Sequence, residues 1–167
     1  QVLSTVASST VEEVTGARGG PIWFQLYTTN RFDVTTRLVK RAEAAGCPVV
    51  AVTVDLPAGR NTETATRLQR LDSRDCGACH QTGANGLPVP GRGGRPMFAG
   101  VDMQGVATQS SSLTWDFIKR LKDVTTMKVV IKGLETREDA LLAVEHGADG
   151  IVVSNHGGRQ LDGVLSS

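Results

Sequence analysis

A histidine and an arginine stand close together near the end of this 167-residue chain, in the segment SNHGGR at residues 154–159. His156 is a candidate base near neutral pH, and Arg159 carries a planar guanidinium that matches the geometry of a carboxylate. The two glycines between them let the backbone turn sharply and let a flat ligand approach closely. This combination suits removal of a proton beside a carboxylate, for example from a 2-hydroxy acid.

Polar side chains also stand at the ends of the other apolar segments of the sequence. In chain order they are Ser4, Gln25, Tyr27, Thr53, Asp55, Lys132 and Ser154. Any one of them could be an ordinary polar group at the margin of a core, but several at the same end of successive strands are typical of parallel α/β proteins, which build their sites there. Asp55 could orient His156. Lys132 adds a second cation, and Tyr27 adds a phenol.

Alternating strands and helices must position these residues. Short apolar segments rich in Val and Ile predict strands, and apolar residues at a spacing of three or four predict helices with Gly46 and Gly147 as stop signals. The expected strands cover residues 2–8, 21–27, 48–57, 128–133 and 150–154, and the expected helices cover residues 31–46, 113–125 and 136–147. Strands that are apolar on both faces indicate a parallel sheet between layers. A (β/α)8 barrel and an open doubly wound sheet both fit this order.

Residues from about 58 to 112 interrupt the alternation. They are rich in Gly, Arg, Pro, Asn and Ser and show little periodicity. Loops longer than roughly 12–15 residues in compact domains are usually functional lids or disordered. We therefore expect a mobile excursion over one end of the sheet.

The composition is that of an ordinary globular protein and excludes several classes. Hydrophobic residues make up 40% and charged residues 21% of the chain, and the net charge is +1. This balance gives no electrostatic reason to expect nucleic acid or an anionic membrane as a partner. No apolar run approaches the roughly 18 residues of a membrane span. No G-x-G-x-x-G or G-x-x-x-x-G-K motif for nucleotide phosphates is present.

The segment DCGACH places Cys76, Cys79 and His80 in the C-x-x-C-H spacing of a c-type haem attachment site. A redox dithiol, half of a zinc site and an ordinary loop are the alternatives. Zinc prefers four ligands, and the chain has no second cysteine pair. Neither an export route nor a distal haem ligand is visible, so we favour an ordinary loop.

Several motifs resemble those of one family, in the same order along the chain. SNHGGRQLDG is similar to the active-site signature of the FMN-dependent L-2-hydroxy-acid oxidases and dehydrogenases, the glycolate oxidase, L-lactate dehydrogenase and mandelate dehydrogenase type. STVASSTVEEV, FQLY, TVDLP and IKG resemble further segments of that family. The resemblance implies that residues 1–167 form part of a single (β/α)8 barrel, roughly its second to sixth strands, since a full barrel takes about 250 residues.

The resemblance also implies a role for each polar residue at the strand ends. His156 would be the base that starts substrate oxidation, with Asp55 holding its imidazole. Lys132 would lie beside the FMN and stabilise the negative charge of the reduced flavin. Arg159 and Tyr27 would bind the carboxylate and hydroxyl region of the substrate. The residues that would hydrogen-bond the FMN are Ser4, Gln25, Thr53 and Ser154.

One of three departures from the family pattern lies at a substrate-binding position; the other two are the absence of the first strand region, with another substrate tyrosine, and of the last two strands, with the flavin phosphate site. A second substrate arginine usually follows the TVD strand, in a GRRE-like segment. This chain has AGRNTE instead, so Arg60 is the nearest candidate for that role.

The expected activity is oxidation of an L-2-hydroxy acid to the 2-oxo acid, with FMN passing the electrons to oxygen, a quinone or a cytochrome. We expect a homotetramer without a resident metal, in the cytoplasm or at the periphery of the inner membrane. The sequence looks like a piece of a longer protein, which by itself should be inactive. The alternatives are a haem- or metal-binding redox module at Cys76, Cys79 and His80, and a non-catalytic barrel fragment.

Overall fold

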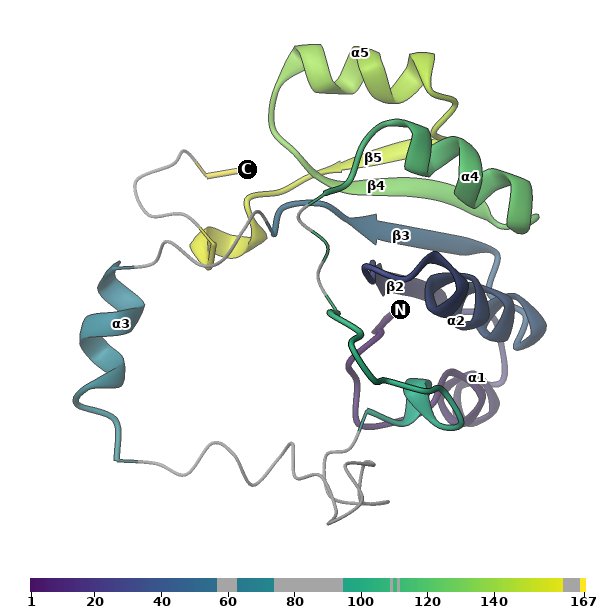
Figure 1. Ribbon diagram of the computed structural model, residues 1–167, viewed down its shortest axis with the longest axis horizontal. Coiled ribbons are helices and arrows are strands. Elements are labelled where there is room, and N and C mark those ends of the chain that lie inside the picture. The colour runs from purple at the N-terminus through teal and green to yellow at the C-terminus, as the bar shows by residue number, and fades with distance from the viewer. Residues whose placement is uncertain (57–62, 74–94, 109, 111, 161–165) are drawn as a thin grey trace.

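Five parallel strands form one sheet in the computed structural model, which describes residues 1–56, 63–73, 95–108, 110, 112–160 and 166–167 (Figure 1). The strands are β1 (Val2–Ser4), β2 (Trp23–Tyr27), β3 (Val49–Thr53), β4 (Lys128–Leu134) and β5 (Gly150–Val153). Each strand pairs with the next along the chain, so the order in the sheet is β1-β2-β3-β4-β5. A doubly wound sheet reverses its strand order at a switch point. The observed order therefore favours the barrel over the open sheet.

Helices join the strands and share a hydrophobic core with one face of the sheet (Figure 1). They are α1 (Val11–Arg18), α2 (Phe32–Ala44), α4 (Asp116–Val124) and α5 (Arg137–Glu145). The buried strand side chains in this core include Leu3, Phe24, Leu26, Val50, Val52, Val129, Ile131 and Leu134. None of the helices in the described part of the chain is both long and apolar enough to cross a membrane.

Helix α1 begins with a capping box that the apolar periodicity alone did not reveal. The Thr10 side chain accepts the Glu13 N–H (3.1 Å), and the Glu13 carboxylate accepts the Thr10 N–H (2.8 Å). The helix ends at Gly19, whose φ is +68°. Only Val11 of this helix is buried, so its sequence carries little hydrophobic pattern, and residues 11–18 were not expected to be helical.

The described parts of the expected long loop contain more structure than their composition suggests. Residues Glu63–Gln69 form helix α3, and Pro96–Phe98 form a 3-10 turn, η2, whose Met97 and Phe98 are buried in the core. Arg41 of α2 donates to the carbonyl oxygens of Pro96 (2.8 Å) and Met97 (3.0 Å). Residues 95–108 therefore pack beside the helices and contribute to the core, which differs from the expected excursion over the end of the sheet.

Asp149 fastens the amino-terminal edge of the sheet, just before β5. Its carboxylate accepts the Val129 N–H (2.8 Å) and contacts the ammonium groups of Lys122 (3.1 Å) and Lys128 (3.2 Å). The Val129 hydrogen bond, together with the two lysines, lowers the pKa of Asp149 to about 2. In barrel folds this edge contributes to stability, and the opposite edge is available for chemistry.

Candidate active site

The polar residues expected at the strand ends share one face and one edge of the sheet. Tyr27 is paired with Thr53, and Thr53 with Lys132, so their side chains form a row across β2, β3 and β4. Side chains alternate along a strand, so this row lies on the face opposite the helices. The segments that follow β3 and β5 begin at the same edge, and they bring Asp55 and His156 to the end of the row.

Asp55 connects the charged groups at this edge. Its Oδ1 lies 2.7 Å from His156 Nδ1, and its Oδ2 lies 2.9 Å from Lys132 Nζ. Ser154 donates its hydroxyl to the same Oδ2 (3.3 Å) and accepts a hydrogen bond from Lys132 (3.2 Å). The Asp55 side chain is only 7% exposed, so these partners, more than water, stabilise its charge. We call Asp55, Lys132, Ser154 and His156 the Asp55 cluster.

The backbone of His156 adopts a left-handed conformation that side chains rarely occupy. Its φ is +61°, and it is the one non-glycine residue with a positive φ in the described part of the chain. Backbone strain of this kind costs about 1–3 kcal/mol and gathers at functional sites. Ser154 Oγ accepts the His156 N–H (3.0 Å), and Asn155 Oδ1 accepts the Gly158 N–H (3.1 Å). These bonds hold the 3-10 turn η3 (His156–Gly158), from which the imidazole reaches Asp55.

The hydrogen bond to Asp55 determines which ring nitrogen of His156 can act as a base. An ionised carboxylate only accepts hydrogen bonds, so His156 Nδ1 donates to Asp55. In the neutral imidazole Nε2 then carries the lone pair. Nε2 lies 3.5 Å from the Tyr27 hydroxyl, and the two rings stack with their centroids 6.4 Å apart. The basic nitrogen therefore faces Tyr27.

Uncharged polar side chains continue from this cluster toward β1. Gln25 and Thr53 are buried, and Gln25 Nε2 donates to Thr53 Oγ1 (2.6 Å). Ser4 is paired with Gln25 across β1 and β2, and its hydroxyl accepts the Val6 N–H (3.3 Å). Amide and hydroxyl groups arranged in this way could hold a planar heterocycle that carries C=O and N–H groups along its edge.

Thr5 supports this row, although the sequence analysis did not single it out. It is fully buried; its hydroxyl donates to the Gln25 carbonyl oxygen (2.6 Å) and accepts the Tyr27 N–H (2.9 Å). Thr5 thereby fixes the end of β2, from which Gln25 and Tyr27 project. In the sequence, Thr5 lies within the family-like segment STVASSTVEEV, directly after Ser4.

Arg159 lies beside the Asp55 cluster and folds back against its own turn. The residue is exposed, and its guanidinium donates to the His156 carbonyl oxygen (3.2 Å). Arg60 and the motif of Cys76, Cys79 and His80 lie outside the described residues, so their expected roles stay predictions. Within the part of the chain that the structure describes, no group of three or more His, Cys, Asp or Glu side chains could hold a metal ion.

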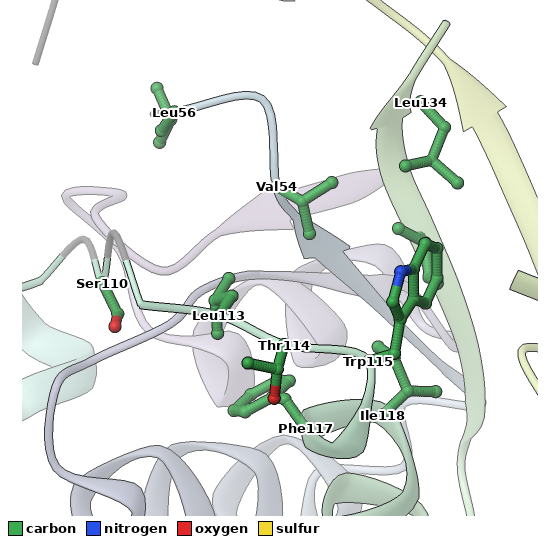
Figure 2. A pocket seen from close by; sticks show the side chains of 10 residues that line it. Val54, Leu56, Ser110, Leu113, Thr114, Trp115, Phe117, Ile118 and Leu134 are labelled. Carbon is green, nitrogen blue, oxygen red and sulfur yellow. The ribbon is translucent and has the colours of Figure 1, made fainter. Parts of the chain in front are cut away.

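A pocket of about 290 Å³ lies on the helix side of the sheet, and its described lining includes no residue of the Asp55 cluster (Figure 2). Figure 2 shows Val54 and Leu134 lining it from the sheet, and Trp115, Phe117 and Ile118 lining it from the start of α4. Its described lining is largely apolar and includes no titratable side chain. The pocket therefore offers no acid, base or cation, and the chemistry belongs to the other face.

The chain is similar to known proteins along nearly its whole length. The model of the FMN-dependent dehydrogenase family matches residues 1–167. The chain is 37% identical over 175 residues to 2-hydroxyacid oxidase 2 of Mus musculus, which covers 99% of the chain and 44% of that relative. It is also 37% identical over 170 residues to L-lactate oxidase of Nostoc sp., which covers 99% of the chain and 46% of that relative.

The fold has counterparts among solved structures. The crystal structure of mandelate oxidase is similar with a TM-score of 0.71 and 38% sequence identity, over 98% of this chain and 42% of that protein. The chain thus spans less than half the length of each of these relatives. The similarity confirms the predicted fold class, an α/β structure that forms part of a (β/α)8 barrel. With a family model that matches its whole length, the chain belongs to the FMN-dependent dehydrogenases.

Proposed function

We propose that this chain supplies the base and the flavin-facing edge of an enzyme that oxidises an L-2-hydroxy acid to the 2-oxo acid with FMN. The observation that carries the proposal is the pairing of His156 Nδ1 with a buried carboxylate while Nε2 faces a phenol at 3.5 Å. Two relatives named as 2-hydroxyacid oxidase and L-lactate oxidase support the substrate class. The chain spans less than half of these relatives, so the activity is proposed for the whole protein.

The donor set at the carboxyl edge fits the ring of FMN. Gln25 and Thr53 carry buried polar groups on this face of the sheet. With Ser4 and Ser154 they would hydrogen-bond the C=O and N–H groups of the ring. Two N–H bonds of Lys132 go to Asp55 and Ser154. Lys132 Nζ also lies 3.5 Å from His156 Nδ1, but Nδ1 itself donates to Asp55 and cannot accept. The third N–H would then face the flavin and stabilise its negative charge on reduction. When bound, FMN supplies the acceptor for the two electrons that leave the substrate.

His156 would take the proton that the oxidation releases. Before the step Nδ1–H is held by Asp55 and Nε2 carries the lone pair. After Nε2 accepts the proton, the positive charge of the imidazolium faces the Asp55 carboxylate, which stabilises it. The geometry serves removal of either the carbon-bound or the hydroxyl proton of the substrate.

Arg159 and Tyr27 would bind the substrate in front of His156. A guanidinium pairs with a carboxylate through two parallel hydrogen bonds, and Arg159 would exchange its contact with the His156 carbonyl oxygen for the substrate carboxylate. The Tyr27 hydroxyl, close to His156 Nε2, would contact the substrate oxygen that becomes the carbonyl.

We infer oxygen as the final electron acceptor, because the relatives are named as oxidases.

The homotetramer and the cytoplasmic location, including attachment at the periphery of the inner membrane, stay predictions. Sedimentation of the full-length protein would test the first, and fractionation of cells the second.

The proposed role of His156 can be tested in the full-length, FMN-loaded protein by measuring the rate of flavin reduction by substrate under anaerobic conditions. His156→Ala should bind FMN and reduce it at least about 1,000-fold more slowly, as expected for loss of a catalytic base. His146→Ala is the matched control, because His146 lies at the end of α5 and stacks on Trp115. This variant should reduce FMN at the wild-type rate. Substantial reduction in His156→Ala would contradict the assignment.

A further inference from the structure

Gly133 interrupts β4 at the point where the strand meets the active site. The register between β4 and β5 shifts between Lys132 and Leu134, which marks a β-bulge around Gly133. The φ of Gly133 is +114°, a conformation that side chains of L-residues rarely adopt. A bulge with a glycine often marks a close approach of another part of the backbone.

The group that approaches Gly133 is Asp55. A Cβ atom placed on Gly133 would lie 2.5 Å from the Asp55 Cβ, 2.7 Å from its Cγ and 2.7 Å from its backbone nitrogen. All three distances are far below van der Waals contact. The backbone of Asp55 is not free to retreat, because the N–H of the preceding residue, Val54, donates to the Lys132 carbonyl oxygen (2.9 Å).

This close approach is particular to Gly133 among the described glycines with positive φ. At Gly19, Gly46, Gly100, Gly105, Gly147 and Gly158 an added Cβ would meet nothing within 4 Å. At Gly157 it would meet the end of the flexible Arg159 side chain at 2.6 Å. Among the glycines that the structure describes, only Gly133 would place a Cβ against the backbone and first side-chain atoms of a residue of the Asp55 cluster.

We propose that Gly133 is a positioning residue of this active site: its missing side chain leaves the space that seats the Asp55 carboxylate, and through Asp55 it orients the His156 imidazole. The seated carboxylate holds His156 Nδ1 at 2.7 Å and Lys132 Nζ at 2.9 Å. A side chain at position 133 would displace Asp55 by several tenths of an ångström or more, and hydrogen bonds weaken steeply with such changes in distance and angle. The inference rests on the proposed function and assigns a further residue to the same reaction.

The test compares Gly133→Ala with Gly147→Ala in the full-length, FMN-loaded protein. Gly147 also has a positive φ, +77°, but an added Cβ meets no atom there, so this variant carries backbone strain without the displacement. Gly133→Ala should lower the rate constant of flavin reduction at saturating substrate by about 100-fold, the order expected for a misplaced catalytic group. Gly147→Ala should stay within about twofold of wild type, and a Gly133→Ala rate within the same twofold would overturn the proposal.

A double variant separates positioning from general damage to the fold. In the Asp55→Ala background the carboxylate is already lost. Adding Gly133→Ala to this variant should therefore lower the rate constant of flavin reduction by a further factor of less than about three. A further loss as large as that in the wild-type background would contradict action through Asp55. FMN affinity and the substrate KM should change less than kcat in Gly133→Ala, because neither depends on the orientation of His156.

Loss of folding and failure of the proposed function give different results from loss of positioning. If Gly133→Ala does not fold, Asp55→Gly together with Gly133→Ala removes two of the three close atoms. This double variant should then fold and show a cooperative melting transition, and its failure to fold would overturn the proposal. If no 2-hydroxy acid reduces the FMN bound to the wild-type protein, the proposed function itself fails. Normal reduction by both wild type and Gly133→Ala would contradict the positioning role alone.

Discussion

Asp55 Oδ1 lies 2.7 Å from His156 Nδ1, although the two residues are 101 positions apart in the chain. The parallel pairing of β3 with β4 and of β4 with β5 brings the segments that follow β3 and β5 to the same edge. Both side chains are largely buried, at 7% and 18% exposure. In such surroundings a charge-assisted hydrogen bond is short and directional, so the orientation of the imidazole depends on Asp55.

The charge of Asp55 should matter more for flavin reduction than for folding. Asp55→Asn keeps the size of the side chain but removes the negative charge that faces His156 and Lys132. We expect the rate of anaerobic flavin reduction to fall by about 100-fold or more. Asp149→Asn, at the opposite edge of the sheet, should leave this rate within about twofold of wild type. Equal losses in the two variants would show that the effect is not specific to the site.

The Tyr27 hydroxyl should contribute to the reaction through its place near His156. Tyr27→Phe removes the oxygen that lies 3.5 Å from Nε2 and keeps the ring that stacks on the imidazole. We expect flavin reduction to slow by about tenfold and FMN to bind as in wild type, since loss of one hydrogen bond near a reacting group costs about 1.4 kcal/mol or somewhat more. Stopped-flow spectroscopy would measure the rate, and a rate equal to that of wild type would remove Tyr27 from the reaction.

Arg159 should act mainly on substrate binding. Arg159→Lys keeps a positive charge but loses the planar fork that pairs with a carboxylate. We expect the apparent Kd of substrate for the oxidised enzyme to rise by about 10-fold or more. Arg37→Lys is the control, because the exposed Arg37 side chain donates to the Gly100 carbonyl oxygen, outside the Asp55 cluster. An unchanged Kd in Arg159→Lys would exclude the carboxylate contact.

Asp149 should stabilise the fold in a pH-dependent way. The pKa of Asp149 in the folded chain is lowered to about 2 by the Val129 N–H and the two lysines, whereas an unfolded Asp titrates near about 3.9. The contribution is therefore complete above about pH 5 and is lost as the pH falls toward 2. Asp149→Asn should lower the free energy of unfolding by about 2 kcal/mol at pH 7. Urea denaturation at several pH values should show this difference shrinking at acid pH; a constant difference would contradict the linkage.

Much of the fold was predictable from the sequence because its signals are local. Runs of Val and Ile predicted β3 and β4, and apolar spacing with a glycine stop predicted α2. The apolar pattern did not predict helix α1, because only one of its residues is buried. Its capping box, Thr10 with Glu13, is a sequence signal that predicts a helix start. The burial of Met97 and Phe98 was hidden within a segment of loop-like composition.

The shared edge of the polar site residues was predictable from the sequence, but the distances between them were not. Strand-end position indicated that Asp55, Lys132 and His156 would share an edge, since parallel strands align their carboxyl ends. The sequence could not indicate that one carboxylate contacts both Lys132 and His156, because these distances depend on how three strands pair. The positive φ of His156 and the space that Gly133 leaves for Asp55 are likewise properties of the packed backbone.

The proposed function predicts that a 2-hydroxy acid reduces the FMN bound to the full-length protein. The absorbance spectrum of the full-length, FMN-loaded protein would be recorded before and after anaerobic addition of L-lactate, glycolate or L-mandelate. We predict that at least one of these acids bleaches the visible flavin bands, and that oxygen restores them. A protein that binds FMN fully but is bleached by none of the three acids would contradict the claim.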